Sequence, residues 1–273
     1  MVKALKLSVA ASAAVVCVMT AGLASAQEAG GTASASGQAG MALPGAAPQA
    51  AATAGDSDHD QVVGRLAVGY MGRVGVPVAT GFNAGPPATV AAANIDAPTI
   101  GVRYWIDQMI GLDVGLGLGM SGGSVTTDPG GNSVDDQGAT AFLIHGGLPL
   151  SLASAGHFSF EIVPELNVGF GSSSFKAPGT PPTGPDIDYS GFLFDIGARA
   201  GAEIHFGFMG IPQLSLQGSI GLLYQMQSVK VTQKAFQNNP EASVKHSTWR
   251  FATTVNDNPW NIFTSNVAAL YYF

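Results

Sequence analysis

Ionisable side chains recur at alternate positions within otherwise apolar stretches of this sequence. Near residue 200, Asp195, Arg199, Glu203 and His205 occupy odd-numbered positions, while Phe, Ile and Ala occupy the even-numbered ones. Successive side chains of a β-strand point to opposite faces, so these ionisable groups would share one face. Applied along the chain, this rule yields one set of inward positions: Arg65, Arg73, Arg103, Asp113, Glu161, Glu165, Asp195, Arg199, Glu203 and His205.

Two kinds of chemistry are open to this set. Matching the heights of neighbouring strands predicts three close pairs, namely Arg103 with Asp113, Glu165 with Arg199, and Glu161 with Glu203. In one interpretation the charges pair and fill a closed interior, because buried charges must be paired. In the alternative, Glu161, Glu203 and His205 form a titrating cluster along a narrow path for ions or small solutes.

The same alternation predicts the elements that carry these groups. Between residues 158 and 170 every even position is apolar, and the odd positions are mostly polar or small. Eight such segments occur, at about 62–73, 97–107, 110–121, 138–152, 157–171, 189–206, 213–227 and 261–273. Short connections alternate with four long ones, at 74–96, 122–137, 172–188 and 228–260.

The composition indicates which face of these strands meets the solvent. Charged residues make up 11% of the chain, against about 25% in soluble proteins, too few to coat a soluble sandwich or barrel. No apolar run of 18 residues follows the N-terminal segment, which argues against membrane helices. A closed barrel is the other structure that satisfies every backbone hydrogen bond in lipid. We therefore predict an all-β fold, an eight-stranded antiparallel up-and-down transmembrane β-barrel over residues 62–273.

The N-terminal part of the chain indicates export. Residues 1–26 have a basic start, an apolar stretch and an Ala-Ser-Ala site, as a cleaved signal peptide does. The one cysteine, Cys17, lies within this segment, and Val16 before it fits a lipid-anchor signal poorly. Residues 27–61 are rich in Ala, Gly and Ser, which predicts a disordered periplasmic tail. An even number of strands would place both ends of the barrel in the periplasm.

The last segment carries a family resemblance. The chain stops at Phe273, and Tyr271, Val267 and Phe263 precede it on the same face. This pattern resembles the terminal strand of bacterial outer-membrane β-barrel proteins, and residues 62–273 resemble the small eight-stranded class that includes the OmpA membrane domain, OmpX and OmpW. The resemblance implies recognition by the barrel-assembly machinery and a location among outer-membrane lipid and lipopolysaccharide. It implies no catalytic residue.

A lipid A-modifying enzyme is another role known among small outer-membrane barrels. Such an enzyme needs a histidine, a serine and an acid near the outer leaflet. His246 and Ser247 lie in the last long connection with Glu241 nearby, but their spacing matches no hydrolase motif. His145 lies in the fourth segment without a serine close by. We therefore expect no enzymatic activity.

The long connections carry aromatic and acidic side chains. The aromatic ones, which could bind a surface ligand or pack loop against loop, are Phe82, Phe175, Phe236 and Trp249. The acidic ones, which could attract Ca²⁺ or bridge lipopolysaccharide, are Asp135, Asp136, Asp186 and Asp188. Isolated acidic pairs are more often solvated, so we expect no metal ion and no cofactor.

These observations predict a structural outer-membrane protein with a charge-filled lumen and four external loops available for surface binding. The identity of any surface ligand stays open. The alternatives are a small porin-like channel and, third, a lipid A-modifying enzyme. The net charge of -7 argues against nucleic-acid binding, which requires a clustered basic surface.

Overall fold

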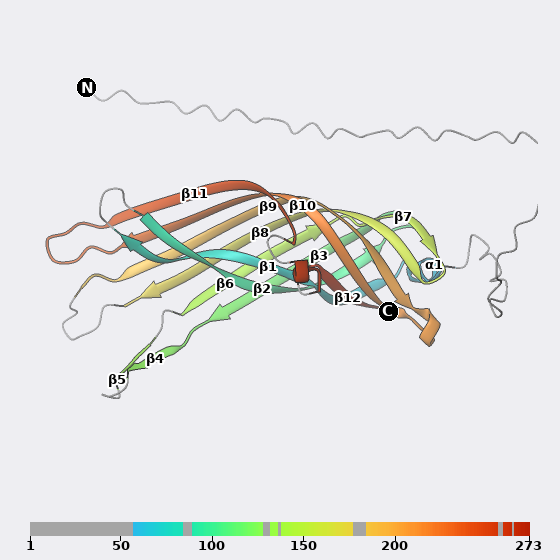
Figure 1. Cartoon of the computed structure of the whole chain (residues 1–273), viewed down its shortest axis with the longest axis horizontal. Coiled ribbons are helices and arrows are strands. Elements are labelled where there is room, and N and C mark those ends of the chain that lie inside the picture. The colour runs from blue at the N-terminus through green and yellow to red at the C-terminus, as the bar shows by residue number, and fades with distance from the viewer. Residues whose placement is uncertain are drawn as a thin grey trace, which may run out of the picture. The chain divides into compact units, whose positions relative to one another are not determined.

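A computed structural model describes residues 57–83, 89–127, 132–135, 138–176, 184–255, 259–263 and 265–273 (Figure 1). The predicted signal peptide, and residues 27–56 of the predicted tail, lie outside the described residues. The described part of the chain is nearly all β-strand. Its helical elements are α1 (Asp58–Val62) and the 3₁₀ turns η1 (Gly207–Met209) and η2 (Pro259–Phe263).

The strands are long and antiparallel, as two-residue alternation predicts. The principal ones are β1 (Leu66–Asn83), β2 (Thr89–Trp105), β3 (Gly111–Ser121), β6 (Ala139–Gly147), β7 (Leu150–Ala155), β8 (Phe158–Phe175), β9 (Ile187–Phe206), β10 (Ile211–Gln233), β11 (Ala242–Thr253) and β12 (Val267–Tyr272). A separate hairpin, β4 (Ser124–Thr127) with β5 (Asn132–Asp135), projects beyond β3 and β6 (Figure 1).

Eight strands form a closed ring of antiparallel pairs. Its order is β1, β2, β3, β6, β8, β9, β10 and β12, and β12 pairs with β1 again. β7 extends the line of β6 along β8, while β11 pairs with the far part of β10. The predicted count of eight strands and their antiparallel order are confirmed.

The ring is staggered, so its strands are tilted, as Figure 1 shows. One path of paired residues starts at Leu216 and runs through Ala269, Tyr70, Ile100, Leu116, Ile144, Val168 and Phe194. It returns to β10 at Met226 rather than at Leu216. Closing a sheet requires such a shear, and the shear sets the tilt of the strands.

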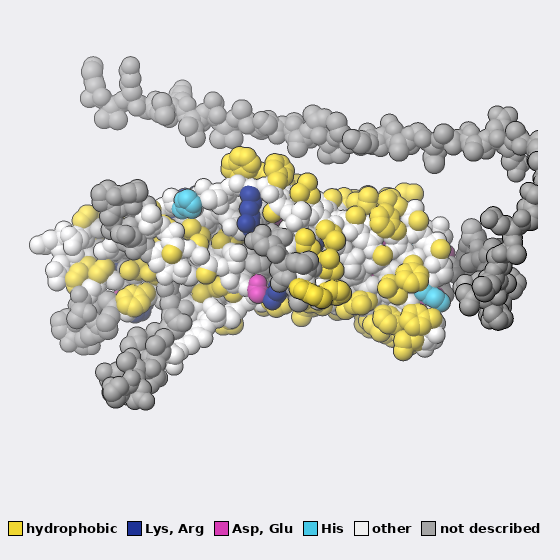
Figure 2. All heavy atoms as spheres, in the orientation of Figure 1, with side chains coloured by type: hydrophobic (Ala, Val, Ile, Leu, Met, Phe, Trp, Pro, Cys, Tyr) yellow, Lys and Arg dark blue, Asp and Glu magenta, His cyan; other side chains and the backbone are white. Residues whose placement is uncertain are grey.

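Large apolar side chains face outward, and most of the predicted charged set faces inward. In β3 the residues alternate strictly, with Asp113 and four glycines buried and the large apolar residues exposed. Met120 is 84% exposed and Asp113 only 1%. Figure 2 shows apolar side chains gathered on the outer surface of the ring, over the part that lies toward α1. The interior combines three small apolar clusters with buried polar groups.

The strands extend farther than the sequence predicts. Residues 74–83 and 89–96, predicted as a loop, continue the paired β1–β2 hairpin. Residues 228–233 and 242–253 likewise continue β10 and β11 as a pair. In these stretches the apolar side chains point inward instead, since Val76, Val78, Val229 and Val231 are buried. They therefore lack the outward apolar alternation from which a transmembrane strand is predicted.

The ring wall has a seam between β1 and β11. β1 pairs with β12 from Ala67 to Tyr70, and Gly72, at φ 103°, interrupts this pairing. The segment predicted as one strand, 261–273, is split into η2 and β12, so β12 begins only at Val267. Within the described residues no strand pairing joins β1 to β11. At the base of the seam, the Arg73 amide donates to the Ser265 carbonyl at 3.3 Å.

Candidate functional site

A buried guanidinium occupies the interior of the ring, where Arg103 is 1% exposed. Its Nε and Nη2 donate to the two carboxylate oxygens of Asp113, both at 2.8 Å. Nη1 donates to Glu203 at 2.9 Å and to Glu161 at 3.4 Å, and Nη2 also donates to Gln217 at 3.1 Å. These five residues, the Arg103 cluster, come from five strands and connect opposite walls of the ring.

Neutral donors offset the excess of negative charge in the Arg103 cluster, where three carboxylates face one arginine. Gln217 Nε2 donates to Glu161 at 2.6 Å, and the Ser159 hydroxyl donates to the same carboxylate at 3.2 Å. The Tyr272 hydroxyl donates to Glu203 at 3.1 Å and accepts a hydrogen bond from the Trp105 indole at 3.0 Å. Buried charge is tolerated when such donors satisfy the remaining lone pairs.

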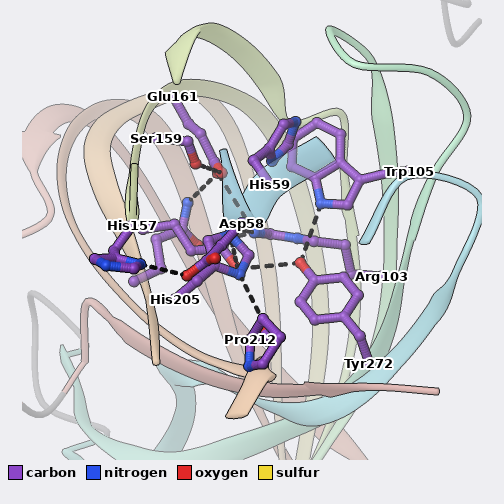
Figure 3. A network of polar contacts seen from close by, with 12 residues as sticks. Asp58, His59, Arg103, Trp105, His157, Ser159, Glu161, His205, Pro212 and Tyr272 are labelled. Atoms are coloured by element: carbon purple, nitrogen blue, oxygen red, sulfur yellow. Dashed lines mark hydrogen bonds and ion pairs between the residues drawn. The ribbon is translucent and has the colours of Figure 1, made fainter. Parts of the chain in front are cut away.

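The helix α1 lies beside the Arg103 cluster (Figure 3). Ser57 and Asp60 form a capping box that starts the helix. His59 is 1% exposed, contacts the Trp105 indole at a centroid distance of 4.5 Å, and shares a hydrogen bond with the Gln108 carbonyl at 3.0 Å. Burial disfavours the charged imidazole and lowers the pKa of His59 below its ordinary value of 6.5.

Asp58 ties α1 to two turns of the ring. Its Oδ2 lies 2.7 Å from His157 Nδ1 and accepts from the Gly207 amide at 3.0 Å, while the Asp58 amide donates to the Gly156 carbonyl at 2.8 Å. A Cβ at position 207 would collide with the Asp58 carboxylate, so this contact requires glycine. Residues 57–61 of the predicted tail thus form the N-cap and most of α1, and the capping box of Ser57 and Asp60 was the available signal in the sequence.

A polar cavity of about 220 Å³ lies inside the ring. Arg199 and Glu165 form an ion pair of 2.7 Å in its wall, and Arg73 pairs with Asp96 at 2.9 Å beside the seam. Asp195 also lines the cavity and accepts a hydrogen bond from Gln225 at 3.3 Å. The interior therefore holds two polar regions, the Arg103 cluster next to α1 and this cavity next to the seam.

The structure brings the predicted pairs together. Arg103 lies beside Asp113, and Glu165 beside Arg199, as strand matching predicted. Glu161 and Glu203 meet on the guanidinium of Arg103. His205 is buried, with Nε2 3.8 Å from Glu203.

Two of the predicted site residues are placed differently. The prediction of an inward Arg65 is wrong: the side chain is exposed, because the residue lies in the turn between α1 and β1. The prediction that Phe263 belongs to the terminal strand is also wrong, since it lies in η2. Val267, Tyr271 and Phe273 do occupy alternating positions at the end of the chain, and both aromatic residues are exposed.

Sequence reasoning missed interior groups because it selected charged residues only. The alternation puts Trp105, Gln217 and Gln225 on the same face as charged residues of their own strand or of the adjacent strand. Tyr272 directly follows the outward-facing Tyr271, so its side chain points inward. The alternation of each strand was therefore a usable signal for all four.

The groups considered for catalysis do not come together. His246 and Ser247 are adjacent in β11, so their side chains point to opposite faces, and Glu241 lies 3.7 Å from Lys234. His145 hydrogen-bonds Asn167 at 2.8 Å. Within the described ranges, no group of three or more His, Cys, Asp or Glu side chains is arranged to hold a metal ion.

The surface candidates have varied environments. Trp249 lies in β11 rather than in a loop and stacks on Tyr224 at a centroid distance of 6.1 Å. Phe175 is exposed at the end of β8. Phe236 is half-buried in the β10–β11 connection. The pairs Asp186–Lys176 and Asp188–Lys234 are ion pairs of 2.8 and 3.0 Å. The side chains of Phe82, Asp135 and Asp136 lie outside what the structure describes.

Comparison with known proteins identified no relative. No protein family, no curated protein and no solved structure matches this chain. Among the described residues, no helix has both the length and the apolar character needed to cross a membrane.

Proposed function

We propose that residues 62–273 form a β-barrel in the bacterial outer membrane, where the chain serves as a structural protein with a closed, charge-filled lumen. The observation that carries this proposal is the orientation of the ring: exposed apolar side chains outside, buried charges inside. Leu118 is 67% exposed and Ile100 65%, whereas Arg103 and Glu203 are at most 1% exposed. A soluble barrel would have the opposite polarity.

Aromatic side chains lie toward both ends of the apolar surface, as interfacial girdles do. Toward the short turns, Tyr271 and Phe273 contact each other at a centroid distance of 5.3 Å. Toward the other end, Tyr224 packs against Trp249 and Phe251. In this proposal the short turns and the barrel termini face the periplasm, and the long hairpins face outward.

On the β1–β2 side of the ring, the position of the seam agrees with this orientation in the membrane. An unpaired strand edge does not occur in contact with the hydrocarbon core of a bilayer. The outward residues of β1 below the seam are apolar, Leu66 and Val68, and the seam begins at the ion pair of the half-buried Arg73 with the exposed Asp96. This change from apolar to charged residues supports a position of the seam at or beyond the outer interface.

The proposal includes export by the signal peptide and insertion by the barrel-assembly machinery, with outer-membrane lipid and lipopolysaccharide as the surroundings. Expression in a Gram-negative host followed by separation of the two membranes tests it. We expect the protein in the outer-membrane fraction, with a gel mobility that changes on heating as it does for folded barrels. Recovery in the inner membrane or the soluble fraction would overturn the proposal.

A closed lumen is supported by the Arg103 cluster, which connects opposite walls, and by α1, which covers it. The second candidate function, a small porin-like channel, is favoured by the polar cavity on the far side of the same cluster. Planar-bilayer recordings of the purified protein separate the two. We expect no discrete conductance, and regular single-channel steps would favour the channel.

No enzymatic activity is part of the proposal, since His246 and Ser247 point to opposite faces of their strand. Mass spectrometry of lipid A from cells with and without the gene tests this. Unchanged lipid A is expected, and a gene-dependent change in its acyl chains would reverse the conclusion.

A further inference from the structure

Five inward residues on five neighbouring strands form a continuous row across one side of the ring interior. His145 pairs with Asn167, Asn167 with Asp195, Asp195 with Gln225, and Gln225 with Arg250 in the strand registers. All five line the polar cavity. We call this row the belt; it runs from the deeply buried His145 on β6 to the exposed Arg250 on β11, beside the seam.

Hydrogen bonds within the belt orient its polar atoms. His145 Nδ1 lies 2.8 Å from the Asn167 side-chain oxygen, so Nδ1 donates and a neutral imidazole presents Nε2 as an acceptor. Gln225 Nε2 donates to Asp195 Oδ2 at 3.3 Å, and Arg250 Nε donates to Gln225 Oε1 at 2.7 Å. The Gln225 amide thus lies between a carboxylate and a guanidinium and holds both in place.

Two buried acceptors of the belt lack partners. His145 Nε2 and Asp195 Oδ1 have no hydrogen bond within the described residues, although His145 is 4% exposed and Asp195 1%. A buried polar atom without a partner destabilises the folded state, so native proteins rarely leave one next to a cavity without a water molecule or a ligand. The two outer nitrogens of Arg250 likewise make no hydrogen bond to any described residue.

The charges of the cavity determine which ligand these atoms suit. Arg199 is neutralised by Glu165 and Arg73 by Asp96, which leaves Asp195 and Arg250 without an opposite charge in direct contact among the described residues. A simple anion would leave Asp195 unpaired, and a simple cation would leave Arg250 unpaired. A molecule that carries both charges compensates both residues and keeps the site neutral.

We propose that this cavity binds a small zwitterion of the α-amino-acid type. Its ammonium group donates to Asp195 Oδ1 and His145 Nε2, the two acceptors without partners, and its carboxylate accepts from the outer nitrogens of Arg250. The exposed position of Arg250 makes the seam the route of access. This inference goes beyond the proposed structural role, and it holds whether or not the Arg103 cluster seals the lumen.

Equilibrium dialysis of radiolabelled serine against the full mature protein in detergent tests the proposal. Lactate has the carboxylate without the ammonium group, and ethanolamine has the ammonium without the carboxylate. We expect serine to bind saturably, and lactate and ethanolamine to compete at least about tenfold less well, because each lacks the charged group that binds one end of the site. Equal competition by all three compounds, or no binding of serine, would overturn the proposal and leave a water-filled cavity.

Substitutions assign the binding to the two ends of the belt. Asp195→Asn and Arg250→Gln should each weaken serine binding by about tenfold or more. Matched controls, Asp188→Asn near the start of the same strand β9 and Lys245→Gln on the same strand β11, should leave it unchanged. Arg250 is exposed, so its variant keeps the test valid even if Asp195→Asn fails to fold. Serine binding that survives both substitutions at full strength would also reject this site.

Discussion

Arg103 and Asp113 face each other across the β2–β3 hairpin, joined by two hydrogen bonds of 2.8 Å between the guanidinium and the carboxylate. A bidentate pair of this kind fixes the direction of the guanidinium plane as well as its position. Nη1 is thereby left to bind Glu161 and Glu203, which come from β8 and β9. One short hairpin contact thus organises the polar interior of the ring.

Replacement of Arg103 should be strongly destabilising. Arg103→Met leaves three buried carboxylates without their cation, and loss of one partner from a buried ion pair costs about 3–5 kcal/mol. We expect a loss of this size in the free energy of unfolding, measured by urea titration in lipid vesicles. Arg65→Met is the matched control, because Arg65 is exposed, and its effect should stay within about 0.5 kcal/mol. Equal effects of the two substitutions would contradict the assigned role of Arg103.

The pairing of Arg103 with Asp113 was accessible from the sequence because it depends on local information. The two residues flank one short turn, so strand alternation and hairpin register suffice to bring them together. Glu165 and Arg199 follow the same logic on neighbouring strands. Arg65 shows the limit of this reasoning. It precedes the first paired residue of β1, so strand alternation does not predict the direction of its side chain.

Other parts of the site depend on contacts that no local pattern reports. The five residues of α1 are too few for an autonomous helix, and their position depends on His157 and Gly207, which lie far away in the sequence. Arg250 lies in a stretch with polar residues on both faces, so neither its strand nor its side toward the belt was predictable. The seam results from the break at η2, which alternation alone did not reveal.

Gly207→Ala should release α1 from the ring. The added methyl group collides with the Asp58 carboxylate, which would have to leave both the Gly207 amide and His157. We expect faster proteolysis near residues 57–62, detected by mass spectrometry of the products. Gly218→Ala is the control, because a Cβ at that position meets no atom within 4 Å. Unchanged cleavage in Gly207→Ala would show that the Asp58 contact does not hold the helix.

Opening the lumen should require the removal of both α1 and the Arg103 cluster. Deletion of residues 27–62 alone leaves the guanidinium and its carboxylates connecting opposite walls, so we expect no discrete conductance in planar bilayers. Addition of Arg103→Ala to this deletion should produce regular openings, and addition of Arg65→Ala should not. Conductance from the deletion by itself would mean that α1, rather than the Arg103 cluster, is the seal.

The stability of the docked α1 should fall as the pH is lowered. The pKa of His59 is lowered by burial, so the folded state binds this proton less readily than the unfolded state. The stabilisation of docked α1 by neutral His59 is therefore complete above about pH 6.5, the ordinary pKa of histidine. It is lost as the pH falls toward the lower pKa of His59 in the folded state. Protection of the α1 amides from hydrogen exchange should decrease over this range.

Other ionisable groups near His59 must be separated from this effect. Glu203 and Asp60 favour the charged imidazole, whereas His205 disfavours it. His157 lies 2.7 Å from the Asp58 carboxylate and is the appropriate control. We expect His59→Gln to flatten the pH dependence of α1 protection and His157→Gln to leave the part due to His59 in place. A pH dependence that is unchanged in His59→Gln would assign it to another group.

The orientation of the ring in a bilayer can be measured with its tryptophans, of which the chain has three. Trp249 is 67% exposed on the outer surface, whereas Trp105 is fully buried inside beside Tyr272. In vesicles of brominated lipid, a variant that retains only Trp249 should lose most of its fluorescence, because its indole contacts lipid. A variant that retains only Trp105 should be quenched little, since the strand wall separates its indole from the acyl chains. Equal quenching of the two variants, or none in either, would contradict a membrane-embedded ring with its apolar face outward.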